Sequence, residues 1–187
     1  MIASERTQNM IVVTVIIVAI ISSGLLVGNA TYYGGSYSLA GRLEVQLLEV
    51  KVSNVDHENA SIYPTISLTF NLHTSSQYEG NVRITFMGAS IRLNDDLLSY
   101  TPVSYIPPVP QQYLTPDFDR NYTLSNTADE GSGDLYPDRQ TIRDADTAGT
   151  WFWEIQYRYS FIVFDQPGTI IFRYFDFNTT VTTIVYA

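Results

Sequence analysis

Two patterns of apolar and polar residues divide the chain. Residues 10–28 form one uncharged run dominated by Ile and Val, whereas from residue 43 onward apolar and polar residues alternate in short stretches. The run has 19 residues. A helix of this length spans about 28 Å, which is close to the thickness of the hydrocarbon core of a bilayer. The sequence therefore predicts one transmembrane helix over residues 10–28, after a short cytoplasmic tail of residues 1–9.

The flanks of this helix predict its orientation. Arg6 lies in the tail, and the next charged residue after it is Arg42. Because positive residues beside a span favour the cytoplasmic side, we expect the tail inside and the rest of the chain outside. A cleaved secretory signal is the alternative, since Gly28-Asn29-Ala30 offers small residues for cleavage after Ala30. Both interpretations place the domain outside the cytoplasm.

The segment after the helix, residues 29–41, is rich in Gly, Ser and Tyr. This composition predicts a flexible linker. The rings of Tyr32, Tyr33 and Tyr37 also fit the membrane–water interface, where amphipathic aromatic side chains collect.

The alternating stretches predict an antiparallel β-domain over residues 42–187. The apolar positions change parity between Leu47 and Leu48, and again between Phe86 and Met87, which predicts a β-bulge at each place. Six to eight such strands indicate an all-β, immunoglobulin-like β-sandwich, with no helix after the transmembrane segment. The expected strands cover residues 43–52, 62–72, 82–93, 97–100, 151–164, 169–177 and 181–186.

Residues 101–150 lack this alternation and contain six prolines. Proline interrupts regular elements, and long irregular segments are usually functional or disordered. We therefore predict a long irregular loop, acting either as a rigid crossover or as a binding loop.

Three stretches resemble the opening half of LEA14/WHy-type β-sandwich domains: LEVQLLEVKVSNVD, IYPTISLTFNL and NVRITFMGASIRLND. His73-Thr74-Ser75 stands where that family has Asn-Pro after its second strand. The resemblance covers residues 43–93 and implies a sandwich without a known catalytic site. The stretch VTVIIVAII is also similar in composition to the N-terminal helices of pilin-like and archaellin-like subunits, which are held in the membrane first and then pack in a filament core.

Composition narrows the function classes. The chain has no cysteine, which excludes disulfides and thiol chemistry. Its formal net charge is −9, with 10 basic and 19 acidic residues. Phosphate backbones repel such a surface, so we expect no nucleic-acid partner. An apolar content of 45% is too high for a disordered exterior region.

Four N-x-S/T sequons lie in the part expected outside the cell. Such sites accept N-glycans on exposed segments of exported proteins. Three of them fall in expected turns or loops, and the fourth lies close to the membrane. The candidate glycosylation sites are Asn29, Asn59, Asn121 and Asn178.

Acidic residues gather at 129–146, where DEGSGD and DADTAG loosely resemble calcium-binding loops. The weak calcium candidates are Asp129, Asp134, Asp144 and Asp146. A solvated acidic loop paired with Arg139 and Arg143 is the favoured interpretation, so no metal or other cofactor is predicted. His57 and His73, the only two histidines, could form a two-histidine metal site, but no further ligand supports it.

The sequence thus predicts a single-pass membrane protein of the cell surface whose exterior β-sandwich has a structural or protein-interaction role, for example as an accessory subunit of a surface or membrane assembly. The expected partners are membrane lipid, a second protein or further copies of the chain, and N-glycans. One alternative is a filament subunit whose helix packs in the filament core. A second is a small extracellular hydrolase using a carboxylate pair; we expect no enzyme activity.

Overall fold

The computed structural model describes residues 2–59, 61–98, 103–127, 136–165 and 170–187. A long helix, α1 (Ile2–Gly41), precedes a domain built mainly of strands. Within these residues, the domain also contains the helices α2 (Val109–Gln112) and α3 (Tyr136–Ala148). Its strands are β1 (Leu43–Val55), β2 (Thr65–Thr74), β3 (Val82–Leu93), β4 (Asp96–Leu97), β5 (Val103–Tyr105), β6 (Asp119–Thr127), β7 (Trp153–Val163), β8 (Ile171–Thr179) and β9 (Thr183–Tyr186).

The described strands form two sheets. One has the order β6-β2-β1-β9, and the other has the order β4-β3-β7-β8 with β5 beside β3. Paired strands are antiparallel, except that β9 runs parallel to β1. Residues 180–182 carry the chain from β8 in one sheet to β9 in the other. The expectation of a long apolar helix followed by a mainly antiparallel β-domain is confirmed.

The core lies between the two sheets and is rich in aromatic rings. The Phe70 ring on β2 lies 4.3 Å from the Tyr157 ring on β7, measured between centroids. Trp153 is fully buried, and its indole N–H donates a hydrogen bond to Thr182 Oγ1 at 2.8 Å. The alternation of β2 is the one predicted for a strand with one buried face, because Ile66, Leu68, Phe70 and Leu72 are all buried.

Both expected bulges occur near their predicted positions. The pairing of β1 with β2 shifts register between Leu47 and Glu49. The pairing of β3 with β7 shifts between Ile84 and Phe86, slightly earlier than expected. Each extra residue lets the apolar positions change parity without leaving the core.

The flexible linker expected at residues 29–41 is wrong, because the whole segment is helical and belongs to α1. Its last turns pack on the domain, where Ser36 and Leu39 are fully buried and Ala40 nearly so. Glycines lower intrinsic helix propensity, but here tertiary packing determines the local structure. The 40 residues of α1 extend over about 60 Å.

The irregular loop expected at residues 101–150 is also only partly correct, because β5, α2, β6 and α3 all lie within it. The expectation of no helix beyond α1 is therefore wrong. The polar helix α3 ends in a Schellman motif, in which Gly149 has a φ of 65°. The N–H of Thr150 donates to the Ala145 carbonyl, and the N–H of Gly149 donates to that of Asp146.

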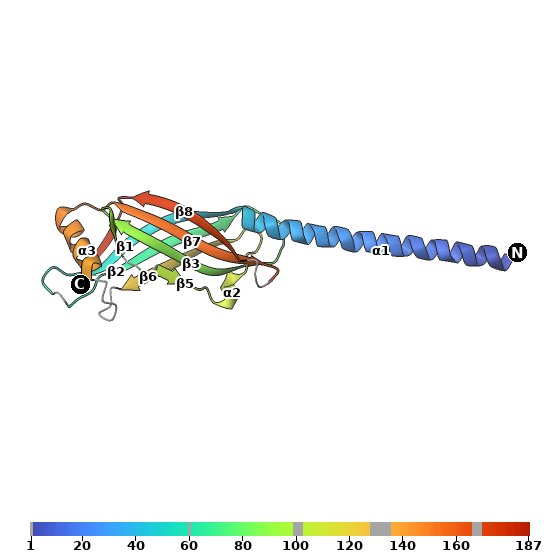
Figure 1. Cartoon of the computed structure of the whole chain (residues 1–187), viewed down its shortest axis with the longest axis horizontal. Coiled ribbons are helices and arrows are strands. Elements are labelled where there is room, and N and C mark those ends of the chain that lie inside the picture. Colours follow the sequence, from blue (N-terminus) through green and yellow to red (C-terminus); the bar gives the residue numbers. More distant parts are fainter. Residues whose placement is uncertain (1, 60, 99–102, 128–135, 166–169) are drawn as a thin grey trace.

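The domain is elongated along the direction of α1 (Figure 1). α1 leaves from one end, which we call the junction end (residues 76–82, 164–165 and 170). α3 and the C-terminus lie at the opposite end, which we call the far end (residues 56–59, 142–149 and 186–187) (Figure 1).

Candidate functional site

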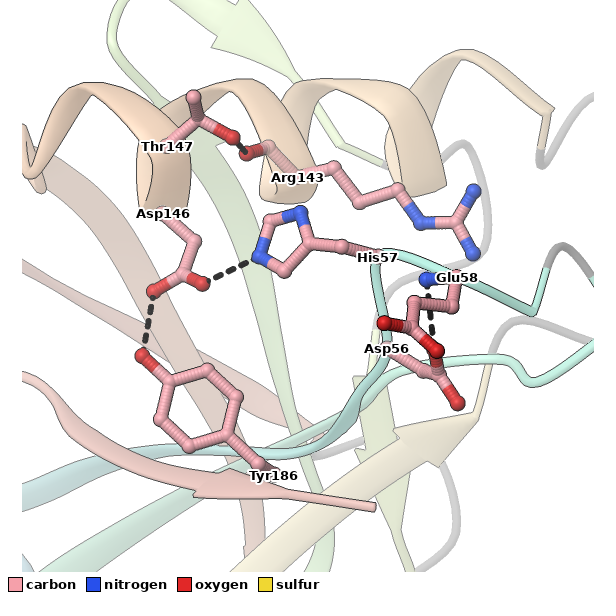
Figure 2. Close-up of polar contacts among 7 residues, drawn as sticks. All are labelled: Asp56, His57, Glu58, Arg143, Asp146, Thr147 and Tyr186. Atoms are coloured by element: carbon pink, nitrogen blue, oxygen red, sulfur yellow. Dashed lines mark hydrogen bonds and ion pairs between the residues drawn. The ribbon is translucent and has the colours of Figure 1, made fainter.

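At the far end, side chains from three separate elements meet (Figure 2). His57 follows β1, Asp146 lies on α3 and Tyr186 lies on β9. His57 Nε2 lies 2.6 Å from one carboxylate oxygen of Asp146, and the Tyr186 hydroxyl donates to the other oxygen at 3.1 Å. We call these three residues the far-end cluster.

Asp146 is the centre of this cluster. Its side chain is 7% exposed, whereas that of His57 is 42% exposed. The hydrogen bond to Asp146 raises the pKa of Tyr186, because a phenolate would lose that bond and be repelled by the carboxylate. A nearly buried carboxylate with a partner on each oxygen holds α3 against the end of β1 and against β9.

The turn that carries His57 has a second connection to α3. Asp56 Oδ1 accepts the backbone N–H groups of Asn59 and Glu58, both at 2.8 Å, and these bonds lower the pKa of Asp56. Arg143 on α3 donates to the Asn59 carbonyl at 2.9 Å. The turn is therefore held by its own aspartate on one side and by α3 on the other.

The geometry of the far-end cluster supports a structural role. A histidine beside a carboxylate is also the arrangement of a general base, which needs a nucleophile or water in reach of its free nitrogen. Here both carboxylate oxygens and one imidazole nitrogen join secondary-structure elements. Across the described residues, no group of three or more His, Asp or Glu lies together as candidate metal ligands.

The calcium candidates do not form one group among the described residues. Asp129 and Asp134 lie outside those residues. Asp144 and Asp146 are two positions apart on α3, so their side chains point to different sides of the helix. Asp144 accepts a hydrogen bond from Gln140 Nε2 at 2.8 Å, whereas Asp146 belongs to the far-end cluster.

The two histidines do not share a site. His57 lies at the far end, beyond the last residue of β1. His73 pairs with Glu44 near the start of β1, and its ring lies 3.3 Å from the Glu44 carboxylate. Because β1 has 13 residues, the two rings are separated by about 35–45 Å along the strand.

All four sequon asparagines have exposed side chains. Asn29 lies on α1, Asn59 in the turn after β1, Asn121 on β6 and Asn178 on β8. The Asn121 side-chain carbonyl accepts a hydrogen bond from Asn71 at 2.9 Å. The use of these sites for glycosylation stays a prediction.

The junction end is held mainly by close backbone approach. A Cβ added to Gly35 would lie 2.0 Å from the Glu79 carbonyl oxygen, and one added to Gly80 would lie 2.6 Å from the backbone N of Ser36. The N–H of Asn81 donates to Ser36 Oγ at 2.9 Å. Only residues without a side chain fit at these two positions, because α1 and the β2–β3 connection touch there.

Aromatic rings continue this contact along α1. The Phe164 ring, which follows β7, lies 4.4 Å from the Tyr33 ring and 5.8 Å from the Tyr32 ring, measured between centroids. Phe164 has a φ of 60°, an uncommon backbone conformation for a bulky residue. The chain thus keeps a strained residue where the ring meets α1.

One side of the sandwich remains open. Among the described strands, β8 pairs only with β7, and β9 covers only the second half of β1. A groove of about 440 Å³ lies between β1 and the β8–β9 connection. On the outer face, a second shallow cavity of about 440 Å³ is lined by Thr85, Phe86, Arg158, Ser160, Ile170 and Phe172.

The outer face of the other sheet, at β2 and β6, is polar and differs strongly from the face that carries this cavity. Its cross-strand partners on β2 and β6 bond to each other through their side chains, with oxygen–oxygen distances of 2.7, 2.7 and 3.1 Å. The pairs are Thr65–Thr127, Ser67–Ser125 and Thr69–Thr123. Polar groups that satisfy one another and face solvent do not require a partner.

Sequence reasoning missed both ends of the domain. At the junction end, the signal was Gly34-Gly35-Ser36. We interpreted these residues as part of a flexible linker, although adjacent small residues also permit close packing. At the far end, residues distant in sequence form the far-end cluster, so spacing carried no signal. The start and end of α3 were marked by Pro137 and Gly149, the usual positions of proline and glycine at a helix.

No protein-family model matches the chain, and no curated protein matches it. Among solved structures, it is similar to a protein from Archaeoglobus fulgidus, at 8% identity and a TM-score of 0.36 over 74% of this chain and 96% of that chain. It is also similar to a β-glucosidase from Kluyveromyces marxianus, at 10% identity and a TM-score of 0.30 over 73% of this chain. The match spans only 14% of the glucosidase. Likeness at these TM-scores carries no argument about function.

Proposed function

We propose that the protein is a single-pass membrane protein whose β-domain lies outside the cytoplasm and has a structural or protein-interaction role. The observation that carries the proposal is an apolar helix that is exposed on all sides and fixed to a folded domain. Side chains from Met10 to Val27 are more than half exposed at every large apolar position. A helix that is apolar all round needs lipid or other helices around it.

The length of α1 supports lipid as its surroundings. Residues 4–41 meet the length and hydropathy expected of a membrane span, with a mean hydropathy of 2.9 in the most apolar window. The same criterion is met by a signal sequence near the N-terminus. The continuity of α1 supports a retained helix, because its apolar run and the buried residues Ser36 and Leu39 belong to one unbroken helix.

We also propose that the sandwich is of the immunoglobulin-like type. In that fold, the first, second and fifth strands share one sheet, while the third, sixth and seventh share the other. Here β1, β2 and β6 share one sheet, and β3, β7 and β8 share the other. The final strand β9 is then an addition that extends the first sheet beside β1.

The interaction role is supported by the open side of the sandwich. β8 carries exposed Ile171, Phe172 and Tyr174 beside an edge that has no partner among the described strands. Proteins usually protect such edges with charged side chains, proline or a bulge; β8 has no proline or bulge, and its charged residues are Arg173 and Asp176. A protein partner or a further copy of the chain would cover this side.

A filament subunit is the second candidate function. The observation that favours it is the same apolar surface of α1, because a filament core of packed helices satisfies such a helix as well as lipid does. In that case α1 leaves the bilayer after synthesis and the domains form the outer layer.

Fractionation of the full chain tests the proposal. We expect the protein in membranes, resistant to a salt wash and released by detergent, with an intact N-terminus by mass spectrometry. Val18→Arg places a charge in the middle of the span and should reduce membrane insertion, since it costs about 2.5–3.5 kcal/mol there. Thr31→Arg, beyond the span, is the matched control. Recovery of the protein in sheared extracellular fibres would contradict the anchor and favour the filament.

A further inference from the structure

The connection between α1 and the domain is rigid. Gly35 and Gly80 touch the opposing backbone, and Ser36 bonds to Asn81. The Leu39 side chain is fully buried in the same contact. The position of the helix therefore fixes the position of the junction end, whatever surrounds the helix.

The height of the junction end above the apolar run follows from the helix rise. Tyr32 and Tyr33 lie four and five residues beyond Gly28, or about 6–8 Å along the axis. The polar layer on each side of a bilayer is about 5–8 Å thick. Because the Phe164 ring lies 4.4 Å from the Tyr33 ring, residues after β7 reach the level of this layer.

The exposed side chains next to this level suit the boundary between lipid and water. Tyr37 is 64% exposed, Tyr78 is 56% exposed and Ile170 is 54% exposed. Beside them, Arg83 and Asp165 form an ion pair with an N–O distance of 2.9 Å, and Glu79 is an exposed charged residue next to Tyr78. Tyrosines and aliphatic side chains are typical of the layer where amphipathic rings collect.

We propose that the junction end contacts the bilayer surface through these side chains, so that the domain stands upright on the membrane rather than on a tether. The inference rests on the proposed membrane anchor. The lipid surface is that of neutral or zwitterionic headgroups, because the chain carries a net charge of −9 and its ten basic residues are spread along it. The far end, with the far-end cluster, points away from the membrane.

Single cysteines test the contact, because the chain has no cysteine of its own. We would attach an environment-sensitive fluorophore to Ile170→Cys and Tyr78→Cys at the junction end, and to Thr147→Cys at the far end. The full chain is reconstituted in phosphatidylcholine vesicles that contain a headgroup-spin-labelled phosphatidylcholine. We expect loss of fluorescence from positions 170 and 78, and none from position 147.

A fourth label separates failure of the inference from failure of the anchor. Val18→Cys reports on the span and should be quenched by an acyl-chain spin label. If position 18 is quenched but positions 170 and 78 are not, the anchor stands and the bilayer contact is wrong. If position 18 is not quenched, both proposals fail. Shielding of position 170 together with crosslinking between copies would show that a second copy, not lipid, covers the junction end.

A pair of charge variants tests whether the contact has an energetic effect. Ile170→Asp should reduce the quenching of a label at position 78, because a carboxylate is disfavoured within the lipid interface. Val185→Asp on β9, also at an exposed apolar position, should leave that quenching unchanged. Equal quenching in the two variants would contradict the contact.

Discussion

Different kinds of contact stabilise the two ends of the domain. At the junction end, Gly35 and Gly80 allow two backbones to touch, and Phe164 packs against two tyrosines. At the far end, Asp146 is the common acceptor for His57 and Tyr186. Packing is nearly independent of pH and salt, whereas partly exposed charged contacts depend on both. We therefore expect the far end to depend more strongly on pH and salt than the junction end does.

The largest effect is expected from a single added methyl group at the junction end. Gly35→Ala should lower the free energy of unfolding by about 1–3 kcal/mol, because its Cβ would overlap the Glu79 carbonyl. Gly34→Ala is the matched control, since nothing lies within 4 Å of its added Cβ. In the control, the free energy of unfolding should rise by about 0.5–1 kcal/mol, because alanine favours the helix more than glycine does. Denaturant titration in detergent, followed by tryptophan fluorescence, measures both; equal effects would contradict the close contact.

At the far end, removal of the shared acceptor should have a smaller effect. Asp146→Ala takes the partner from both His57 and Tyr186 and should cost about 1–2 kcal/mol. Asp144→Ala, two residues away on α3, loses one exposed contact and should change stability by less than about 0.5 kcal/mol. Hydrogen exchange should show faster exchange in α3 and β9 for the first variant only. Unchanged exchange in both variants would remove the structural role of the cluster.

Tyr157 lies in the core and belongs to neither end. A substitution there is a reference that should change the stability of both ends alike. Its hydroxyl is buried and has no hydrogen-bond partner among the described residues. Tyr157→Phe should therefore stabilise the domain by about 1 kcal/mol, because an unsatisfied buried polar group is removed. Thermal unfolding measures the gain, and a loss of stability would show that the hydroxyl has a partner.

The same core tyrosines predict alkaline unfolding. Burial raises the pKa of Tyr157 and raises that of Tyr159 to about 12. A group whose pKa is raised by folding stabilises the native state below its unfolded pKa, and this contribution is lost as the pH rises from about 10 toward the folded value. Tyr157→Phe should therefore lose less stability between pH 10 and 12 than the unmodified chain does.

How much the sequence could predict differs between these regions. β2 and the first half of β7 were predictable because one face of each is buried, so they show a period of two that depends on local sequence alone. β5 and β6 were missed, since both lie in the stretch expected to be irregular. The junction was not predictable, because Gly34-Gly35 is compatible with a flexible linker and with close packing. Only the position of Glu79 in the structure distinguishes these two possibilities. The far-end cluster joins positions 57, 146 and 186, and such contacts follow from the topology. α3 was missed because few of its residues face the core; Ile142 and Ala145 are the buried ones whose side chains are described.

The smallest effect expected is the response of the far end to acid. Backbone N–H groups of Asn59 and Glu58 lower the pKa of Asp56 below its ordinary value of 3.8. A carboxylate whose pKa is lowered by folding stabilises the native turn above 3.8, and the contribution is lost as the pH falls through the folded value. The protection of residues 57–59 against hydrogen exchange should therefore fall below about pH 4, while that of residues 79–81 at the junction end should not. Asp56→Asn, which cannot titrate, should abolish the difference. If both segments lose protection together in acid, the proposed difference between the packed junction end and the charged far end is wrong.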